Sequence, residues 1–297
     1  MKVEQIDHLG IYVKDLDKGA QFFRDVFGFE FSREFGAEGM DVREVVDRVG
    51  LDLLAAKTSD GPIARIIERR GEGLASLSLK VPSLEEGIEE MKSRDIRLIH
   101  RGDHGEAAKW ATFHPKDLFG VFVELVEYNP ENLYLSAARK PPAVLYPKGE
   151  EPPKIKVEGI DHVGIYVKDL DRAIKVLENL FGLEFSPTFG PEDEDVLQVM
   201  DPLGINLMAP KTNDGPMARL IERRGEGLSS LTFKVPDIEK AIVELTSLGI
   251  RQVKRGQYSE NAKWATFHPK DLFGVFINLV EYHALHPYLA LFGDFQK

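Results

Sequence analysis

The chain contains no cysteine among its 297 residues. This absence excludes a disulfide scaffold, a thiolate metal site and a cysteine nucleophile. Long hydrophobic runs are also missing, since no apolar stretch approaches the ~18 residues needed to cross a bilayer. The N-terminal segment MKVEQIDHLG lacks the basic and then apolar profile of a signal peptide. We therefore expect a soluble, cytoplasmic protein with no membrane partner.

Basic residues are few relative to acidic ones, with 38 Lys and Arg against 49 Asp and Glu and a net charge of −11. Such a chain is repelled by phosphate backbones, so we expect no nucleic-acid partner. Hydrophobic residues make up 43% and charged residues 29%, a balance typical of globular proteins. At about 150 residues per domain, the length predicts two domains.

The sequence consists of one unit that occurs twice. Three segments recur at a constant offset of 154 residues, and they begin at Ile6 and Ile160, at Gly61 and Gly215, and at Lys109 and Lys263. A period this long indicates duplication of a whole domain rather than a solenoid. We expect a first domain over residues 1–128, a Pro-rich linker over 129–154, a second domain over 155–282 and a tail over 283–297. The apolar end of the tail, LALFGDF, is predicted to dock on a domain surface.

Strand and helix patterns alternate within each unit. In the first, Ile6–Val13 alternates as a strand does, and Asp15 or Asp17 can cap a helix that ends at Phe27 and Gly28. Four further strands are predicted over residues 29–31, 42–46, 51–54 and 74–81. A helix opened by Pro82 and Ser83 follows, and then three strands over residues 96–99, 110–113 and 121–127. The unit thus has an α+β plan, βαβββ followed by βαβββ, with helices backing a curved sheet.

The two faces of the predicted strands differ in character. One face is apolar and should pack against the helices: Leu9, Ile11, Leu51, Leu53, Leu77, Leu79, Val121, Val123 and Leu125. The other carries His8, Glu44, Asp52, Ser76 and Glu124. A sheet curled around this second face would bring one imidazole and three carboxylates to a shared cavity, a donor set that suits Mg²⁺, Mn²⁺, Co²⁺, Ni²⁺ or Zn²⁺. The alternative is that these are polar residues on the solvated face of an open sheet.

The opening motif DHLGIYVKDLD, with FGFE after the next helix, resembles the vicinal oxygen chelate superfamily of glyoxalases, bleomycin-resistance proteins and dioxygenases. Within it, LDLLAAKTSDGPIARII, GEGL and FHPKDLFGVFVELVEY are similar to methylmalonyl-CoA epimerases. The resemblance implies two tandem vicinal-oxygen-chelate domains, each made of paired βαβββ motifs with a curled mixed sheet around a cavity. Since single domains of this superfamily commonly pair, it also implies either a monomer with an internal pseudo-dimer or a homodimer.

The resemblance further implies one divalent metal ion, bound by His, Gln, His and Glu, and glutamates that move a substrate α-proton. By position, His8, Asp52 and Glu124 are the metal ligands, while Ser76 stands at the second histidine position. Glu44 and Glu124 fall on the catalytic acid/base positions. Serine is a poor neutral ligand, so the metal would keep one more water or depend more on Asp52.

The second copy provides an internal comparison. At the matched positions it has His162, Gln198, Asn206, Ser230 and Asn278, so three carboxylates are replaced by three amides. An amide cannot act as a general base or as an anionic ligand. We therefore expect an active first domain and a degenerate second domain; the alternative is that neither is catalytic.

The resemblance implies a metal-dependent epimerase or isomerase acting on a small-molecule substrate, with an acyl-CoA as the substrate class. A glyoxalase-type lyase would use the same parts. A second hypothesis is a non-catalytic, resistance-type protein that binds a small molecule without metal. An iron dioxygenase is a weaker alternative, because a 2-His-1-carboxylate site needs a second histidine.

Overall fold

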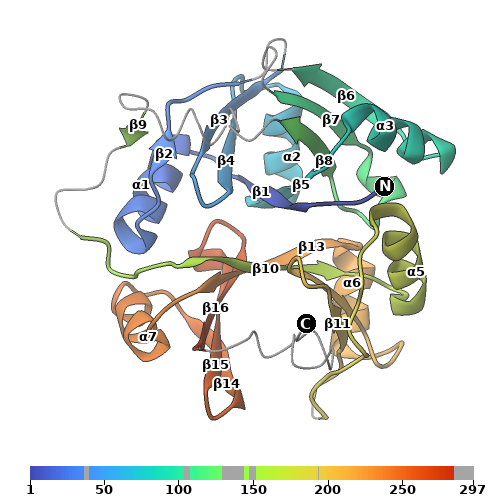
Figure 1. Cartoon of the computed structure of the whole chain (residues 1–297). Helices are drawn as coiled ribbons and strands as arrows, with labels where there is room; N and C mark the ends of the chain where they lie inside the picture. The colour runs from blue at the N-terminus through green and yellow to red at the C-terminus, as the bar shows by residue number, and fades with distance from the viewer. Residues whose placement is uncertain (37–39, 104–107, 129–143, 147–151, 193, 284–297) are drawn as a thin grey trace.

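The computed structural model describes residues 1–36, 40–103, 108–128, 144–146, 152–192 and 194–283 (Figure 1). In the N-terminal half the elements are β1 (Gln5–Tyr12), α1 (Leu16–Phe27), β2 (Phe31–Ser32), β3 (Val42–Val46), β4 (Leu51–Ala56), α2 (Pro62–Arg70), β5 (Gly73–Lys80), α3 (Leu84–Ser93), β6 (Leu98–Asp103), β7 (Ala108–Phe113) and β8 (Val123–Tyr128). A short 3₁₀ helix, η1 (Pro115–Asp117), joins the last two strands.

The C-terminal half repeats this order. Its elements are β10 (Gly159–Tyr166), α5 (Leu170–Phe181), β11 (Leu197–Met200), β12 (Ile205–Ala209), α6 (Pro216–Arg224), β13 (Gly227–Lys234), α7 (Ile238–Ser247), β14 (Gln252–Ser259), β15 (Ala262–Phe267), η2 (Pro269–Asp271) and β16 (Phe276–Tyr282). The predicted α+β plan of two tandem domains is confirmed. The helices α2 and α6 are additions that the strand pattern did not predict.

Each half forms one curled, mixed sheet of seven strands. The strand orders are β3-β4-β1-β5-β8-β7-β6 and β11-β12-β10-β13-β16-β15-β14. The first strand of each half pairs parallel with one neighbour and antiparallel with the other. In Figure 1 the N-terminal sheet lies above the C-terminal sheet, with β5 and β13 in contact between them. The two sheets open away from each other, so each half keeps its own concave face.

Local sequence signals set the ends of the helices. Asp15 is the N-cap of α1, accepting a hydrogen bond from the Lys18 amide, and Gly28 ends the helix with φ +79°. Ser83 caps α3 in the same manner. A side-chain acceptor satisfies an amide that has no partner within the helix, and glycine adopts the left-handed conformation without steric cost. Of the two predicted cap candidates, Asp15 and Asp17, the structure selects Asp15; the predicted C-cap at Gly28 and the predicted opening of a helix at Pro82 and Ser83 are confirmed.

The predicted apolar faces form the core. All nine residues expected there are buried, none more than 3% exposed. The core of one half continues into that of the other, because Leu77, Leu79 and Val123 face Leu177 and Phe181 of α5 around one small apolar space. The apolar face of the N-terminal sheet is thus covered by the other half of the chain as well as by its own helices.

Aromatic rings join the two halves. Phe273 of the C-terminal half lies 5.4 Å from Phe22 and 5.6 Å from Phe23 of α1, measured between ring centroids. Phe233 contacts Phe27 and Phe29 in the same way, at 5.4 Å each. Offset or edge-on aromatic pairs at these distances add stability beyond the area that they bury.

Backbone contacts also tie the connecting segment to the first domain. The short strand β9 (Val144–Tyr146) pairs antiparallel with β2, and the amides of Lys154 and Ile155 donate to the carbonyls of Asp25 and Val26. The remainder of the predicted linker, and the predicted docking of the tail, lie outside the described residues. Within the described part of the chain, none of the helices has the length and apolar character needed to span a membrane.

Candidate functional site

Strand pairing places the predicted site residues on one concave face. His8 of β1 is paired with Ser78 of β5, and Ser78 is paired with Glu124 of β8. Paired residues project to the same side of a sheet, so these three side chains form a row across three strands. Asp52 of β4 is paired with Gly10, two residues beyond His8, and therefore shares this face. Glu44 of β3 lies on it too, since Val46, two residues later, pairs with Asp52.

His8 is held from both sides. Its Nδ1 lies 2.8 Å from Asp7 Oδ2, and the Tyr128 hydroxyl donates to the other oxygen of Asp7 at 2.6 Å. Its Nε2 lies 2.8 Å from Ser78 Oγ, and both His8 and Ser78 are buried. The contacts at Nδ1 and Nε2, together with the hydrogen bond from Tyr128 to Asp7, fix the plane of the imidazole ring. The sequence pattern missed Asp7 in this role.

A break in strand register brings Asp7 beside His8. The ladder between β1 and β5 shifts between Ile6 and His8, as at a β-bulge: Ile6 pairs with Leu79 and His8 with the adjacent Ser78. Simple alternation would place Asp7 on the face opposite His8, whereas a bulge re-aims one side chain. The sequence signal that could have revealed this contact is the Asp-His pair, which occurs at the start of both units.

The direction of the hydrogen bonds at Ser78 indicates which nitrogens of His8 carry a proton, and therefore its charge. The Ser78 hydroxyl donates to Glu124 Oε2 at 2.6 Å, which uses its single hydrogen. Nε2 of His8 must then donate to Ser78 Oγ, while Nδ1 faces a carboxylate. Burial alone would lower the pKa of His8, but hydrogen bonds to Asp7 and Glu124 raise this pKa well above its usual range. An imidazolium is the form that fits these contacts.

Two further acids, Asp52 and Glu44, lie on this face, and neither forms an ion pair with a cationic side chain among the described residues. Burial raises the pKa of Asp52 to about 7; the charge of Glu124 adds to this and that of His8 opposes it. Burial, followed by the charges of Asp52 and Glu124, also raises the pKa of the partly buried Glu44 well above its ordinary value. Asp52 Oδ1 is buried and has no hydrogen-bond partner among the described residues. Like charges on one concave face favour either protonation or a bound cation.

The structure brings together two of the three predicted ligands. His8 Nε2 and Glu124 Oε2 are 3.2 Å apart, a separation compatible with binding to one ion. No group of three or more His, Asp or Glu side chains converges closely enough to hold a metal in the ranges that the structure covers. The donor chemistry nevertheless fits a divalent cation, because it offers one imidazole nitrogen and carboxylate oxygens, one of them the unpartnered atom of Asp52.

Ser78, rather than Ser76, contacts the predicted ligands. Ser76 lies two residues before Ser78 on β5 and pairs with Gly10, where a side chain on residue 10 would collide with the Ser76 hydroxyl. Ser76 shares the concave face with Ser78, because residues two apart on a strand point to the same side. The alternation in ASLSLK contained this signal for Ser78, but only the register shows which serine lies opposite His8.

The C-terminal half repeats the framework without the acids. His162 Nδ1 lies 2.6 Å from Asp161, and Nε2 lies 2.9 Å from Thr232 Oγ1. The Asn278 amide donates to Thr232 at 3.2 Å, whereas the matched Glu124 accepts from Ser78. Thr232 therefore keeps its own hydrogen for His162, and the direction of the hydrogen-bonded chain is reversed relative to the N-terminal half.

Comparisons with known proteins agree with this architecture. The family described as "Glyoxalase/Bleomycin resistance protein/Dioxygenase superfamily" matches residues 5–125 and again residues 161–266. Methylmalonyl-CoA epimerase, mitochondrial, of Mus musculus is 29% identical over 132 residues, covering 42% of this chain and 73% of that protein. An uncharacterized protein of Bacillus subtilis is 28% identical over 132 residues, covering 42% and 93%. A mutant of 4-hydroxymandelate synthase from Streptomyces coelicolor superimposes with a TM-score of 0.70 at 18% identity, covering 98% of this chain and 97% of that one.

Proposed function

Because the chain belongs to the glyoxalase/bleomycin resistance protein/dioxygenase superfamily, we propose that its N-terminal half is a metal-dependent epimerase or isomerase. The substrate class is an acyl-CoA with an acidic α-proton, of the methylmalonyl-CoA type. Similarity to the mouse epimerase supports this class. The observation that carries the proposal is the acidic face: Glu44, Asp52 and Glu124 share one concave face of the first half, and amides stand at the matched positions of the second half.

The carboxylates of the site have distinct tasks in this proposal. Glu124, which accepts the Ser78 hydrogen bond as a carboxylate, takes the α-proton. Glu44, whose raised pKa favours the protonated form, delivers a proton to the opposite face of the same carbon, which inverts the centre. Exchange with water then removes the proton that the base has gained and replaces the proton that the acid has lost. Once His8 has given up its Nε2 proton, a divalent ion held by His8, Asp52 and Glu124 would supply Lewis-acid stabilisation of the enolate oxygen.

The hydrogen-bonded framework fixes the geometry of this exchange. Asp7 and Tyr128 orient His8, and Ser78 holds one oxygen of Glu124 at 2.6 Å. Side chains held in this way need little reorganisation when charge moves onto the substrate.

The experiment that tests this function is solvent exchange. Methylmalonyl-CoA incubated with the whole chain in D₂O, with divalent metal added, should incorporate deuterium at C2, as followed by NMR. Glu44→Gln and Glu124→Gln should each slow the exchange by about 10²–10⁴-fold, the usual contribution of a general acid or base. The matched variants Gln198→Ala and Asn278→Ala, in the second half, should leave the rate unchanged. Absence of exchange by the native chain with every divalent metal tried would exclude the epimerase.

One observation favours a second candidate, a metal-free small-molecule binding protein. The Ser78 hydroxyl already bridges His8 and Glu124, so these groups satisfy each other without an ion. Such a protein would keep its ligand affinity after chelator treatment and would cause no deuterium incorporation. Elemental analysis separates the two functions: the enzyme should carry about one divalent ion per chain and lose it in Glu124→Gln.

A further inference from the structure

The row of paired side chains on the acidic face continues beyond Glu124. Thr112 of β7 is paired with Glu124 of β8, so both side chains lie on the same side of the sheet. Trp110, two residues before Thr112 on the same strand, shares this side. Its indole ring extends over Gly102 of β6, because a Cβ added at Gly102 would meet three ring atoms of Trp110 at 2.6, 2.8 and 3.2 Å. Strands β7 and β6 lie at the edge of the sheet farthest from Glu44.

These two residues each bury a polar group that has no partner. Trp110 is 7% exposed and Thr112 is 5% exposed. Trp110 Nε1 and Thr112 Oγ1 are buried atoms without a hydrogen-bond partner among the described residues. A buried donor without an acceptor is destabilising, and most such groups in proteins are paired. Two of them on one strand, both on the face of the proposed active site, indicate that a ligand completes their hydrogen bonds.

The second half repeats the two residues in a different environment. Trp264 and Thr266 occupy the matched positions in an identical KWATF segment, but both are only partly buried. The ring of Trp264 lies 6.1 Å from that of Tyr258, and the ammonium of Lys254 lies 5.9 Å from its centroid. Because water reaches this second pair, the residue types alone do not create unsatisfied groups. The acidic face of the first half does.

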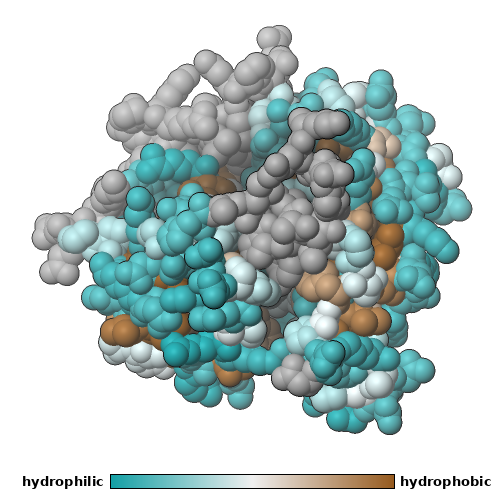
Figure 2. Space-filling view, turned by 60° about the horizontal axis from the view of Figure 1, so that its bottom comes forward, coloured by the Kyte–Doolittle hydropathy of each residue, from teal (hydrophilic) through white to brown (hydrophobic). Residues whose placement is uncertain are grey.

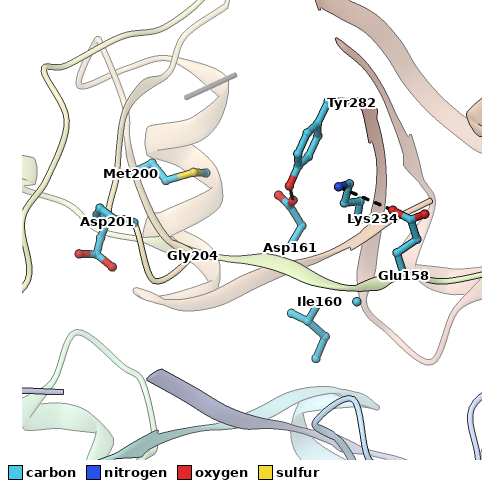
Figure 3. Close-up of a pocket in the computed structure, with 10 residues that line it drawn as sticks. Glu158, Ile160, Asp161, Met200, Asp201, Gly204, Lys234 and Tyr282 are labelled. Atoms are coloured by element: carbon cyan, nitrogen blue, oxygen red, sulfur yellow. Dashed lines mark hydrogen bonds and ion pairs between the residues drawn. The ribbon is translucent and has the colours of Figure 1, made fainter. Parts of the chain in front are cut away.

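A pocket of about 300 Å³ in the second half shows the opposite situation (Figure 3). In Figure 3 the Tyr282 hydroxyl points to Asp161, to which it donates at 2.6 Å, and the Lys234 ammonium pairs with Glu158 at 3.6 Å. The buried Asp201 accepts two backbone amides. The polar groups of this pocket are satisfied within the chain, so its volume alone does not define a ligand.

The chemistry of the unpartnered pair defines the ligand atom. An indole N–H only donates, so the partner of Trp110 is an acceptor, whereas the hydroxyl of Thr112 can donate or accept. Neither group carries a charge. A carboxylate of the ligand at this place would be repelled by Glu124, which stands directly opposite Thr112. An uncharged carbonyl oxygen is the acceptor that fits.

The position of the pair defines the part of the ligand. Neighbouring strands are ~4.8 Å apart, so Thr112 lies one strand spacing outside Glu124, on the side away from Glu44. In the proposed mechanism the reacting carbon lies between these two glutamates, so the pair contacts a group several bonds from this carbon. Asp52, also 5% exposed, is as deeply buried as Thr112. A substrate that reaches the acids therefore reaches the pair as well.

We propose that Trp110 and Thr112 bind the amide carbonyl in the thiol arm of the substrate. This inference rests on the proposed function, because coenzyme A thioesters carry a secondary amide two methylene groups from the sulfur. The Trp110 N–H donates to the carbonyl oxygen, and the Thr112 hydroxyl donates to the same oxygen or accepts from the amide N–H. The two residues thus determine specificity for the arm and leave the proton transfer to Glu44 and Glu124.

Two thioesters that differ in this amide test the inference. S-propionyl-N-acetylcysteamine contains it, and S-(2-ethoxyethyl) propanethioate replaces it with an ether. The chain has two tryptophans, so the whole chain with Trp264→Phe reports on Trp110 alone by fluorescence. With divalent metal added, the amide thioester should change the Trp110 emission saturably. It should also bind about tenfold or more tightly than the ether, because a site built around a hydrogen bond rejects a ligand that lacks the group.

Variants of Thr112 and Trp110 locate the contact. Thr112→Val keeps the shape of the side chain and should lower the preference for the amide thioester by about tenfold, without weakening the ether. Trp110→Phe, measured by calorimetry, should lower the same preference. Thr112→Ser retains the hydroxyl and should restore it. Thr266→Val, in the second half, is the matched control and should leave both affinities unchanged.

The outcomes separate this inference from the proposed function. Equal affinity of the native chain for the two thioesters would overturn the inference, as would an unchanged preference in both Thr112→Val and Trp110→Phe. Binding of neither thioester would overturn it too. The deuterium exchange of methylmalonyl-CoA decides the proposed function independently, since that assay does not depend on which residues hold the arm.

Discussion

Three side chains distinguish the two halves at the residue scale. Glu44, Asp52 and Glu124 correspond to Gln198, Asn206 and Asn278, while the Asp-His pair and the tyrosine that supports it occur in both halves. Removing the acids changes both the charge and the direction of the hydrogen bonds around the histidine. A buried acidic face is costly unless protonated or bound to a cation. Retention of that face in one half only is the strongest local indication of chemistry.

The first residue-scale prediction concerns Ser76→His. Gly10 lies directly opposite Ser76, and the space over it is occupied by the Ser76 hydroxyl and by Leu54 Cδ1, so an imidazole at residue 76 would replace the hydroxyl and displace the end of the Leu54 side chain. An added nitrogen donor should tighten divalent-metal binding by about tenfold or more, because ligand number and type set affinity at such sites. Competition with a chromophoric chelator measures the change.

The matched control is Ser230→His in the second half. That site offers amides in place of carboxylates, so the variant should gain little affinity. Equal gains in the two halves, or none in either, would argue against a metal centre on the acidic face.

At the element scale, buried aspartates tie strand ends together. Asp47, at the end of β3, accepts the amides of Glu30 and Val49 and thereby joins the segment after α1 to the β3–β4 turn. Asp201 does the same in the second half with Glu184 and Leu203. Burial raises the pKa of Asp47 to about 6, against an ordinary value of 3.8, despite the hydrogen bonds that it accepts.

This raised pKa predicts the pH dependence of stability. Between pH 4 and 6 the folded carboxyl of Asp47 retains a proton that the unfolded chain has lost, so the free energy of unfolding falls as pH rises through this window. The contribution of this group is about 3 kcal/mol, from a shift of about two pKa units. Urea unfolding at a series of pH values should show a shallower fall in Asp47→Asn than in the native chain. Parallel curves for the two proteins would contradict the prediction; Asp201→Asn should alter the slope in the same direction.

At the scale of the whole molecule, the two halves dock reciprocally. Gly120 and Gly274, with φ of +75° and +74°, lie after the phenylalanines of the repeated DLFG turns. A Cβ on Gly120 would collide with the carbonyl of Glu226, and one on Gly274 with the carbonyl of Glu72. Each half thus inserts a glycine turn against the other. The exposed face in Figure 2 is largely hydrophilic where coloured, with hydrophobic residues in a few separate patches.

Gly274→Ala tests this docking. The substitution introduces both a left-handed alanine and a collision across the junction, and it should lower the free energy of unfolding by about 3 kcal/mol. Gly249→Ala is the control, because Gly249 has φ +81° and its Cβ would meet no atom within 4 Å; it should cost only about 1 kcal/mol. Thermal and urea unfolding measure both. Equal losses for the two variants would show that backbone strain, not contact between the halves, decides the effect.

The sequence by itself determined the duplication, the order of strands and helices apart from α2 and α6, the helix caps and the apolar face of each strand, because these depend on short-range periodicity and on residue type. It also placed His8, Glu44, Asp52 and Glu124 on one face, since alternation along a strand needs no knowledge of its neighbours. The tertiary structure alone decided that Ser78 lies between His8 and Glu124, that a bulge turns Asp7 toward the histidine, and that α5 covers the apolar face of the first sheet. Register and docking arise from contacts between residues distant in the chain, and a linear pattern contains no measure of those distances.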